Sequence, residues 1–293
     1  MSHRHHGQEP DWATLGPELE REAELHLPYL EQAARWLVDL LGPGDRGAPA
    51  VRRVLDVGSG PGVVSTLLAE TFPTAEVVAV DQAPELLRRV RERAAARGLA
   101  DRVVTHRADL PGAFDALPAA DLVWTSKVVH HFGDQQAAVD ALARRLRPGG
   151  LLAVAEGGLP LRYLPRDAGV GRPGLQARLD AVWEEGFAEM RAELPGTTRV
   201  VEDWPAMLAA AGLVPSGSRT FLTEHQAPLG KAAREHLHSR LSRLRDRLGD
   251  RLAPDDRAAL DELLDPQAAT GVLARPDAFL LQATTVHTAR LTP

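Results

Sequence analysis

Three glycines alternate with other residues in the stretch VLDVGSGPG, residues 54–62, directly after an apolar segment that contains Asp56. Gly58, Gly60 and Gly62 leave the main chain free of side chains at alternate positions, so a ligand can approach the backbone closely. A dinucleotide-binding fingerprint would need a further glycine at position 63, which is valine here. The pattern therefore predicts a small-ligand site of another kind.

Two acids follow later apolar segments and extend this predicted site. Asp81 comes after residues 76–80, and its carboxylate can accept hydrogen bonds from both hydroxyls of a ribose. Asp109 comes after residues 102–107, where it can accept the amino group of an adenine. Together with the glycine turn, these acids indicate a nucleoside ligand.

Candidate acid–base groups follow two more apolar segments. His130 and His131 come after residues 121–126, and Glu156 comes after residues 151–155. An imidazole or carboxylate placed there can take a proton from a hydroxyl or N–H group of a substrate. Packing or capping for the histidines, and solvation for Glu156, are the alternatives to this role.

Four aromatic residues are candidates for contact with a substrate. Tyr29 belongs to helices expected before the glycine turn, and Trp124 precedes the two histidines. Trp183 and Phe187 are four residues apart, so they share one face of a helix. That face either lines the core or covers an apolar substrate.

The order of the segments predicts a doubly wound α/β fold. Apolar, strand-like segments alternate with segments of helical period, which requires parallel strands with helices on both faces. The strand-like segments are residues 51–57, 76–80, 102–107, 121–126 and 151–155, and the helical ones are 63–71, 84–97 and 134–146. Ligands of such sheets bind at the carboxyl ends of the strands, where the glycine turn and the acids would meet.

The remaining segments divide the chain further. We expect residues 1–10, with His3, His5 and His6, to be a disordered tail, residues 11–45 to form helices broken at Pro17 and Pro28, and residues 42–49 to act as a linker. Residues 50–225 with 276–293 would form the ligand-binding domain. Within it, residues 157–198 are expected to be a loop that contains a helix at 175–193. Further elements are expected as a helix at 204–213 and strands at 219–223 and 279–288.

A charged, helical stretch at residues 226–275 is expected to be an insertion before the last strand. Its leucines form one apolar stripe, and its charges are interleaved in sign as on a solvated helix. His236 and His238 would face different ways, which argues against a metal site. The insertion would act either as a lid over the pocket or as a contact in a homodimer.

The composition narrows the class of protein. The absence of cysteine excludes thiolate metal sites and cysteine nucleophiles, and a net charge of −6 argues against a nucleic-acid partner. The arginines between positions 88 and 97 are expected on a solvated helix with little acid nearby. No apolar run has the length of a membrane span or a secretory signal, so we expect no membrane association and a cytoplasmic location.

The motifs together resemble those of class I S-adenosylmethionine-dependent methyltransferases over about residues 51–156. They are the glycine turn that begins with Asp56, then Asp81, Asp109 and the segment LRPGGLL at 146–152. The resemblance implies a Rossmann-like sheet, S-adenosylmethionine as the cofactor and S-adenosylhomocysteine as its product.

The resemblance also implies roles for individual residues. Asp56, Gly58, Gly60 and Gly62 would form the loop that holds the methionine part, with the backbone of Ser126 and Lys127 beneath it. Asp81 and Gln82 would hold the ribose, and Asp109 with Leu110 the adenine ring. These roles account for every residue of the predicted nucleoside site.

The chain further resembles natural-product tailoring methyltransferases of actinobacteria, and residues 121–142 resemble enzymes that methylate C3 of an indole. A small aromatic or heteroaromatic substrate is therefore expected, with Tyr29, Trp124, Trp183 and Phe187 around it. The motif of amine-methylating DNA enzymes is absent after residue 126, and no acids are grouped there to bind magnesium, so no metal is expected. O-methylation of a phenol or polyketide, a non-catalytic nucleotide-binding module and an NAD-dependent oxidoreductase are the alternatives.

Overall fold

The computed structural model describes residues 11–42 and 51–292. The predicted tail at 1–10 and nearly all of the predicted linker at 42–49 lie outside the described residues. The strands are β1 (Arg53–Val57), β2 (Glu76–Asp81), β3 (Val103–Arg107), β4 (Ala120–Ser126), β5 (Leu146–Arg162), β6 (Val214–His225) and β7 (Leu280–Arg290). The α-helices are α1 (Trp12–Leu25), α2 (Leu27–Leu41), α3 (Val63–Thr71), α4 (Pro84–Ala96), α5 (Gln135–Ala143), α6 (Leu175–Glu193), α7 (Trp204–Ala210), α8 (Lys231–Leu248) and α9 (Pro254–Leu264).

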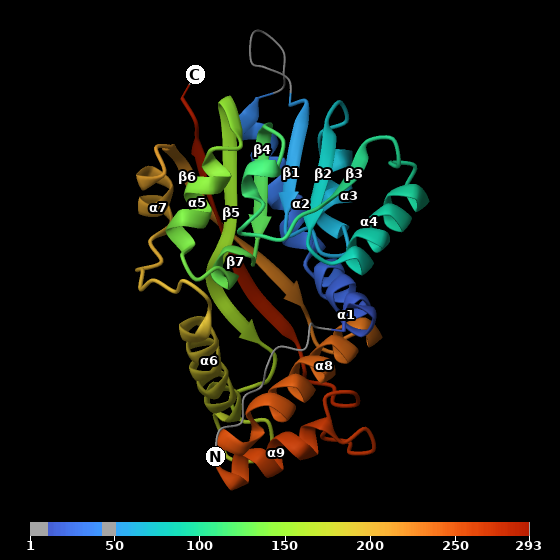
Figure 1. Ribbon diagram of the computed structural model, residues 1–293. Helices are drawn as coiled ribbons and strands as arrows, with labels where there is room; N and C mark the ends of the chain where they lie inside the picture. Colours follow the sequence, from blue (N-terminus) through green and yellow to red (C-terminus); the bar gives the residue numbers. More distant parts are fainter. Residues whose placement is uncertain (1–10, 43–50, 293) are drawn as a thin grey trace.

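The strands form one mixed sheet in the order β3-β2-β1-β4-β5-β7-β6 (Figure 1). β1 to β5 are parallel, which confirms the predicted doubly wound α/β fold. The sequence predicted no direction for the two C-terminal strands, and β7 runs antiparallel to both β5 and β6, which makes the sheet mixed. The reason is that α8 and α9 lie beyond one end of the sheet, and the chain re-enters the sheet from the end at which it left.

Helices cover both faces of the sheet because successive strand residues point to opposite sides. Val54 and Leu122 belong to the core beneath α2, α3 and α4, whereas their neighbours Leu55 and Val123 belong to the core beneath α5 and α7. Both cores combine buried aliphatic and aromatic side chains of the strands with those of the covering helices. No helix in the described part of the chain is both long and apolar enough to cross a bilayer.

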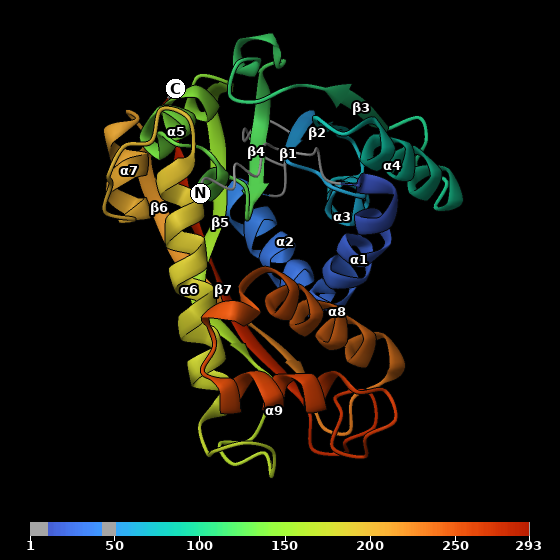
Figure 2. The same ribbon diagram turned by 60° about the horizontal axis from the view of Figure 1, so that its bottom comes forward.

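β5 extends well beyond its predicted end at residue 155. After a bulge its pairing with β7 continues through Leu159 and Arg162, so the first residues of the predicted loop at 157–198 are strand. This extension and the start of β7 contribute to a third apolar core, formed mainly by α6, α8, α9 and their connections (Figure 2). A helical cap, defined as α6, α8 and α9, therefore lies beyond the carboxyl ends of the central strands.

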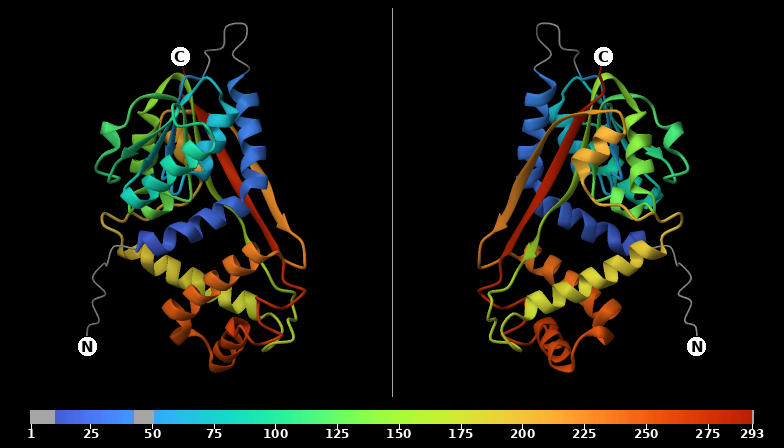
Figure 3. Two further views of the ribbon diagram at one scale, coloured as in Figure 1. Left: turned by 90° about the vertical axis from the view of Figure 1, so that its right-hand side faces the viewer. Right: turned by 90° about the vertical axis from the view of Figure 1, so that its left-hand side faces the viewer.

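The N-terminal helices connect the sheet to this cap. α1 packs against α4 on one side and α8 on the other (Figure 3). The predicted break at Pro17 was wrong, because α1 continues through it. Glu20 of α1 accepts hydrogen bonds from Arg89 and Arg93 of α4, which hold the helix despite the missing backbone N–H of proline.

The arginines predicted on a solvated helix with little acid of its own meet acids of other helices. Arg93 contacts Glu24 as well as Glu20, at 2.9 and 2.8 Å, and Arg97 contacts Glu70 at 2.9 Å. The acids come from α1 and α3, so the sequence around α4 alone gives no sign of them.

Gly62 is expected to be required for folding. Its φ is +85° and a Cβ built there would lie 2.9 Å from the Val90 backbone in α4, whereas Gly98 (φ +68°) has no atom within 4 Å of such a Cβ. Gly62→Ala should lower the free energy of unfolding by about 2–4 kcal/mol, through backbone strain and overpacking, and Gly98→Ala by about 1–2 kcal/mol, through strain alone. Urea denaturation measures both, and equal losses would contradict the packing role of Gly62.

Candidate active site

The three glycines after β1 have different surroundings. A Cβ on Gly58 would overlap the side chain of Val128, which follows β4, and a Cβ on Gly62 would press against α4. Gly60 has a φ of +52° and no atom within 4 Å of the corresponding position. Of the three, Gly60 is therefore the one whose open side can meet a ligand.

Asp81 lies next to this open position. Its carboxylate accepts hydrogen bonds from the backbone N–H of Gly60 and of Ala83, each at 3.0 Å. Burial raises the pKa of Asp81 above its ordinary value, although these N–H groups act to lower it. The structure thus brings together the turn and the acid that the sequence assigned to one ligand.

Asp56 faces the protein interior rather than this opening. It is 2% exposed and accepts a hydrogen bond from the Ser65 hydroxyl of α3 at 2.5 Å. Burial, with a smaller effect from the charge of Asp81, raises the pKa of Asp56 to about 7. Its place indicates a role in holding the start of α3 against β1.

The residues assigned to the adenine ring lie at the same edge of the sheet. The Ala108 N–H donates to the Asp81 carbonyl at 3.1 Å, so the segment after β3 follows the end of β2. The side chains of Asp109 and Gln82 are exposed, and Leu110 is half-buried against the core on the α5 side. Asp81 and Asp109 therefore follow neighbouring strands, as the predicted nucleoside site requires.

The chain turns sharply after β4. Lys127 has a φ of +55°, the only non-glycine residue in the left-handed region within the described residues. Such strain persists only where surrounding contacts hold it, and it is common at functional sites. Here the Lys127 N–H donates to the Ala155 carbonyl at 3.1 Å, and the turn directs the next two N–H groups toward Glu156.

Glu156 binds the turn through both carboxylate oxygens. Oε1 accepts hydrogen bonds from the N–H groups of Val128 and Val129, each at 3.0 Å, and Oε2 lies 2.8 Å from Nδ1 of His130. The carboxylate is buried, with 6% of Glu156 exposed. Because an ionised carboxylate only accepts, Nδ1 of His130 carries the hydrogen, and its Nε2 can accept one.

His131 extends this line of contacts toward solvent. Its Nε2 lies 3.1 Å from Nε2 of His130, and its ring has an exposed edge. Desolvation, with a smaller effect from the neighbouring His130, lowers the pKa of His131 below its ordinary value. Glu156, His130 and His131 thus form a hydrogen-bonded chain, here called the Glu–His–His chain.

Helix α6 covers this chain. The Phe187 ring meets the His130 ring edge-on, with centroids 5.4 Å apart. Arg191, one turn further along α6, donates to the carbonyl oxygens of His130 and Phe132. Sequence reasoning missed Arg191, which ties the cap to the turn after β4.

A group of polar residues lies between α1, α2, the end of β4 and α8. Lys127 Nζ donates to Glu22 of α1 at 2.9 Å, and His26 contacts Gln282 of β7 at 3.1 Å. The charge of Lys127 lowers the pKa of Glu22 well below its ordinary value against the opposing effect of burial. The Tyr29 hydroxyl lies 3.5 Å from that of Ser126, so Tyr29 reaches the predicted cofactor edge.

The other aromatic residues that were predicted to contact the substrate lie in different parts of the structure. Trp183 packs against Arg240 of α8, and Phe187 against His130, so their shared face of α6 points into the molecule. Trp124 is instead 2% exposed and packs in the core on the α2 side, which corrects its assignment to substrate contact. Residues in β4 alternate between two covered faces, so its ring is directed into that core.

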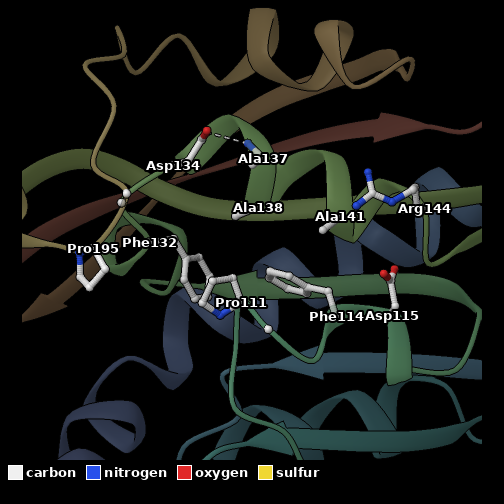
Figure 4. A pocket seen from close by; sticks show the side chains of 13 residues that line it. Pro111, Phe114, Asp115, Phe132, Asp134, Ala137, Ala138, Ala141, Arg144 and Pro195 are labelled. Atoms are coloured by element: carbon white, nitrogen blue, oxygen red, sulfur yellow. Dashed lines mark hydrogen bonds between the residues drawn. The ribbon is translucent and has the colours of Figure 1, made fainter.

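A cavity of about 350 Å³ has none of Glu156, His130 and His131 in its lining. Its lining includes Pro111 and Phe114 after β3, Phe132 after β4, and Pro195 after α6 (Figure 4). The Phe114 and Phe132 rings meet edge-on with centroids 5.6 Å apart. It begins one residue after Leu110, so it borders the segment assigned to the adenine ring.

No three or more His, Asp or Glu side chains in residues 11–42 and 51–292 are grouped as metal ligands would be. His236 is buried in α8, whereas Nε2 of His238 lies 3.1 Å from the Leu264 carbonyl of α9. The two histidines therefore face different ways.

Residues 54–150 match the family described as "Methyltransferase domain". A trans-aconitate 2-methyltransferase from Azoarcus sp. is 32% identical over 172 residues, which are 58% of this chain and 60% of that relative. A demethylmenaquinone methyltransferase from Thermus thermophilus is 40% identical over 111 residues, which are 36% of this chain and 48% of that relative. The chain spans about half the length of these curated relatives.

The fold extends this similarity to nearly the whole chain. A candidate methyltransferase from Bacillus halodurans superposes with a TM-score of 0.51 at 18% identity, covering 89% of this chain and 99% of that one. The fold is Rossmann-like, as in that structure. Residues 54–150 form a methyltransferase domain of the class I type that uses S-adenosylmethionine.

The residues present fit the cofactor of this class. The open side of Gly60 leaves room beside the carboxylate of Asp81. In the same turn the Ser59 hydroxyl is buried and finds no hydrogen-bond partner among the described residues. A buried hydroxyl without a partner is unfavourable, and a polar ligand in this position would satisfy it.

The buried histidines should make stability depend on pH. Burial, aided by the charge of Lys127, lowers the pKa of His26 to about 3, and burial lowers that of His236 to about 4, both from an ordinary 6.5. Each therefore contributes stability that is complete above pH 6.5 and is lost as the pH falls, by about 2 kcal/mol per histidine between pH 7 and pH 5.

His26→Gln should reduce this loss by about 2 kcal/mol, as measured by urea denaturation at both pH values. A His26→Gln variant with the parent's full pH dependence would contradict the assignment.

Proposed function

We propose that the protein transfers a methyl group from S-adenosylmethionine to a small aromatic or heteroaromatic acceptor of natural-product biosynthesis. The main support is the Glu–His–His chain, which ends in an exposed ring at the same sheet edge as the open side of Gly60. A base beside a cofactor seat suits transfer to an atom that must lose a proton.

The cofactor would occupy the edge formed by the ends of β1 to β4. Asp81 and Gln82 would hold the ribose, Asp109 and Leu110 the adenine, and the turn at Gly58, Gly60 and Gly62 with Ser126 and Lys127 the methionine part. When bound, S-adenosylmethionine supplies an electrophilic methyl group on a sulfonium sulfur. The protein then contributes chiefly orientation, which in well-aligned reactions removes about 7–11 kcal/mol of the barrier.

The Glu–His–His chain would take the proton of the acceptor. Glu156 fixes the hydrogen on Nδ1 of His130, so Nε2 of His130 accepts from Nε2 of His131. His131 then presents its Nδ1 as the accepting atom at the exposed end. A proton taken there leaves through solvent or is stabilised by the buried carboxylate behind it.

The aromatic side chains around the chain favour a flat acceptor. Phe187 stands edge-on to His130, and Trp183 continues the same face of α6. Tyr29 is 2% exposed in the same core as Trp124, so it reaches this edge through its hydroxyl alone. Methylation at C3 of an indole fits this arrangement, because the attacking ring must give up its N–H proton. A phenol would use the same base for its hydroxyl proton, so O-methylation is the second candidate.

Two other classes fit the site less well. A non-catalytic nucleotide-binding module has no need of a buried carboxylate that fixes a histidine tautomer. An NAD-dependent oxidoreductase would need the glycine register that Val63 interrupts.

Binding of S-adenosylhomocysteine but not NADH is the first expected outcome, measured by calorimetry. Gly60→Ala and Asp81→Asn should each weaken S-adenosylhomocysteine binding at least about tenfold. The first variant places a methyl group in the proposed cofactor site, and the second removes the carboxylate that would accept hydrogen bonds from the ribose. Gly98→Ala introduces similar backbone strain elsewhere and should leave binding unchanged. No uptake of this nucleoside, or unchanged uptake in both variants, would rule out the proposed cofactor seat.

Glu156→Gln should slow methyl transfer about a hundredfold without weakening cofactor binding. The new amide would donate to Nδ1 of His130, which moves the ring hydrogen to Nε2 and removes the accepting atom. Labelled S-adenosylmethionine with indole and phenol panels measures the rate and the methylated atom, and ¹⁵N NMR of the histidine rings reports the tautomer. Glu184→Gln, exposed on α6, is the control, and equal rates in both variants would argue against the base.

A further inference from the structure

We propose that the acceptor carries a carboxylate and that Arg240 of α8 binds it. This inference rests on the proposed function, because it concerns the acceptor of the same site. It adds a residue that the sequence motifs do not include, and it restricts the acceptors to acids.

Arg240 is half-buried without an anionic partner. Its guanidinium carbon lies 5.0 Å from the centroid of the Trp183 ring, and within the described residues no carboxylate or hydrogen-bond acceptor pairs with it. It also lines a cavity of about 10 Å³, room for about one water molecule, together with Tyr163 and Asp180. A partly desolvated guanidinium is unfavourable unless its donors are used.

The other arginines of α8 are satisfied or exposed. Arg234 donates to backbone carbonyls, whereas Arg243 and Arg245 pair with carboxylates. Arg247 has no such partner but is exposed, where water serves its donors. Arg240 therefore differs from its neighbours in being both covered and unpaired.

The position of Arg240 matches the far end of a flat acceptor. Trp183 and Phe187 lie on one face of α6, with Arg240 against the first ring and His130 against the second. An acceptor whose ring reaches the Glu–His–His chain along Phe187 would extend past Trp183 to Arg240. Its carboxylate would meet the guanidinium there.

The nearby acids of the chain form no ion pair with Arg240. Asp180 lines the same small cavity; burial raises its pKa, the charge of Arg240 acts in the opposite direction, and its hydrogen bond is to Gln176 at 3.0 Å. Glu22 is held by Lys127. The positive charge of Arg240 acts on Lys127 and on His236. Arg240 and Lys127 therefore face the same interior of the molecule. A planar carboxylate fits the fork of a guanidinium better than it fits an ammonium group.

Matched acids and amides test this inference on the full chain saturated with S-adenosylhomocysteine. Calorimetry with indole-3-acetate and indole-3-acetamide should show about tenfold tighter binding of the acid. Arg240→Gln should remove that preference while leaving amide binding and S-adenosylhomocysteine affinity unchanged. Arg240→Lys should keep part of it, and the control Arg247→Gln should keep all of it.

The possible failures are distinguishable. If S-adenosylhomocysteine binds but the acid binds no better than the amide, or neither binds at millimolar concentration, the carboxylate inference is overturned and the proposed function stands. A preference that survives Arg240→Gln overturns the role of Arg240. Failure of S-adenosylhomocysteine to bind overturns the proposed function, and the inference with it.

Discussion

The site depends on the contacts of one buried carboxylate, that of Glu156. Its oxygens accept hydrogen bonds from two consecutive backbone N–H groups and contact His130, which holds Lys127 in a left-handed conformation. Val128, turned inward by the same contacts, fills the space that Gly58 leaves by having no side chain. The geometry of the glycine turn and that of the histidines are therefore set together.

This coupling explains why the ends of β4 and β5 behave as one unit. The Lys127 N–H bonds to Ala155, so the residue before Glu156 and the residue after β4 are fixed against each other. Arg191 adds a second attachment from α6, through the carbonyl oxygens on either side of His131. A displacement of α6 must therefore change the position of the His130 ring.

Local patterns in the sequence were sufficient for the parallel part of the sheet and for bringing the glycine turn and the two acids to one edge. The alternation of apolar and helical segments fixes the order of elements, and the glycine turn, Asp81 and Asp109 each follow a strand, so their meeting at one edge follows from the fold. The prediction that Trp124 contacts the substrate was wrong because β4 is covered on both faces. The alternation of its side chains between the two faces does not indicate which face would hold a ligand. Pro17 was misread because the contacts that sustain α1 come from α4.

Long-range pairs were beyond such reasoning. Lys127 and Glu22 are 105 positions apart, and Arg191 is 61 positions from His130. The sequence around Lys127 or Arg191 gives no indication of the partner, because each pair forms only after the cap and the N-terminal helices have packed. The length of β5 has the same origin, since its extension is determined by pairing with β7 beyond a bulge.

The separation of the three apolar cores has a consequence for how the molecule can change. The core of the cap shares no buried residue with the cores on the two faces of the sheet. Altering the shape of the cap interior therefore need not disturb the nucleoside edge, which is built from the ends of β1 to β4. The interior of the cap and the edge proposed to hold the cofactor can in this way differ independently, while the extended strands β5 and β7 connect the two.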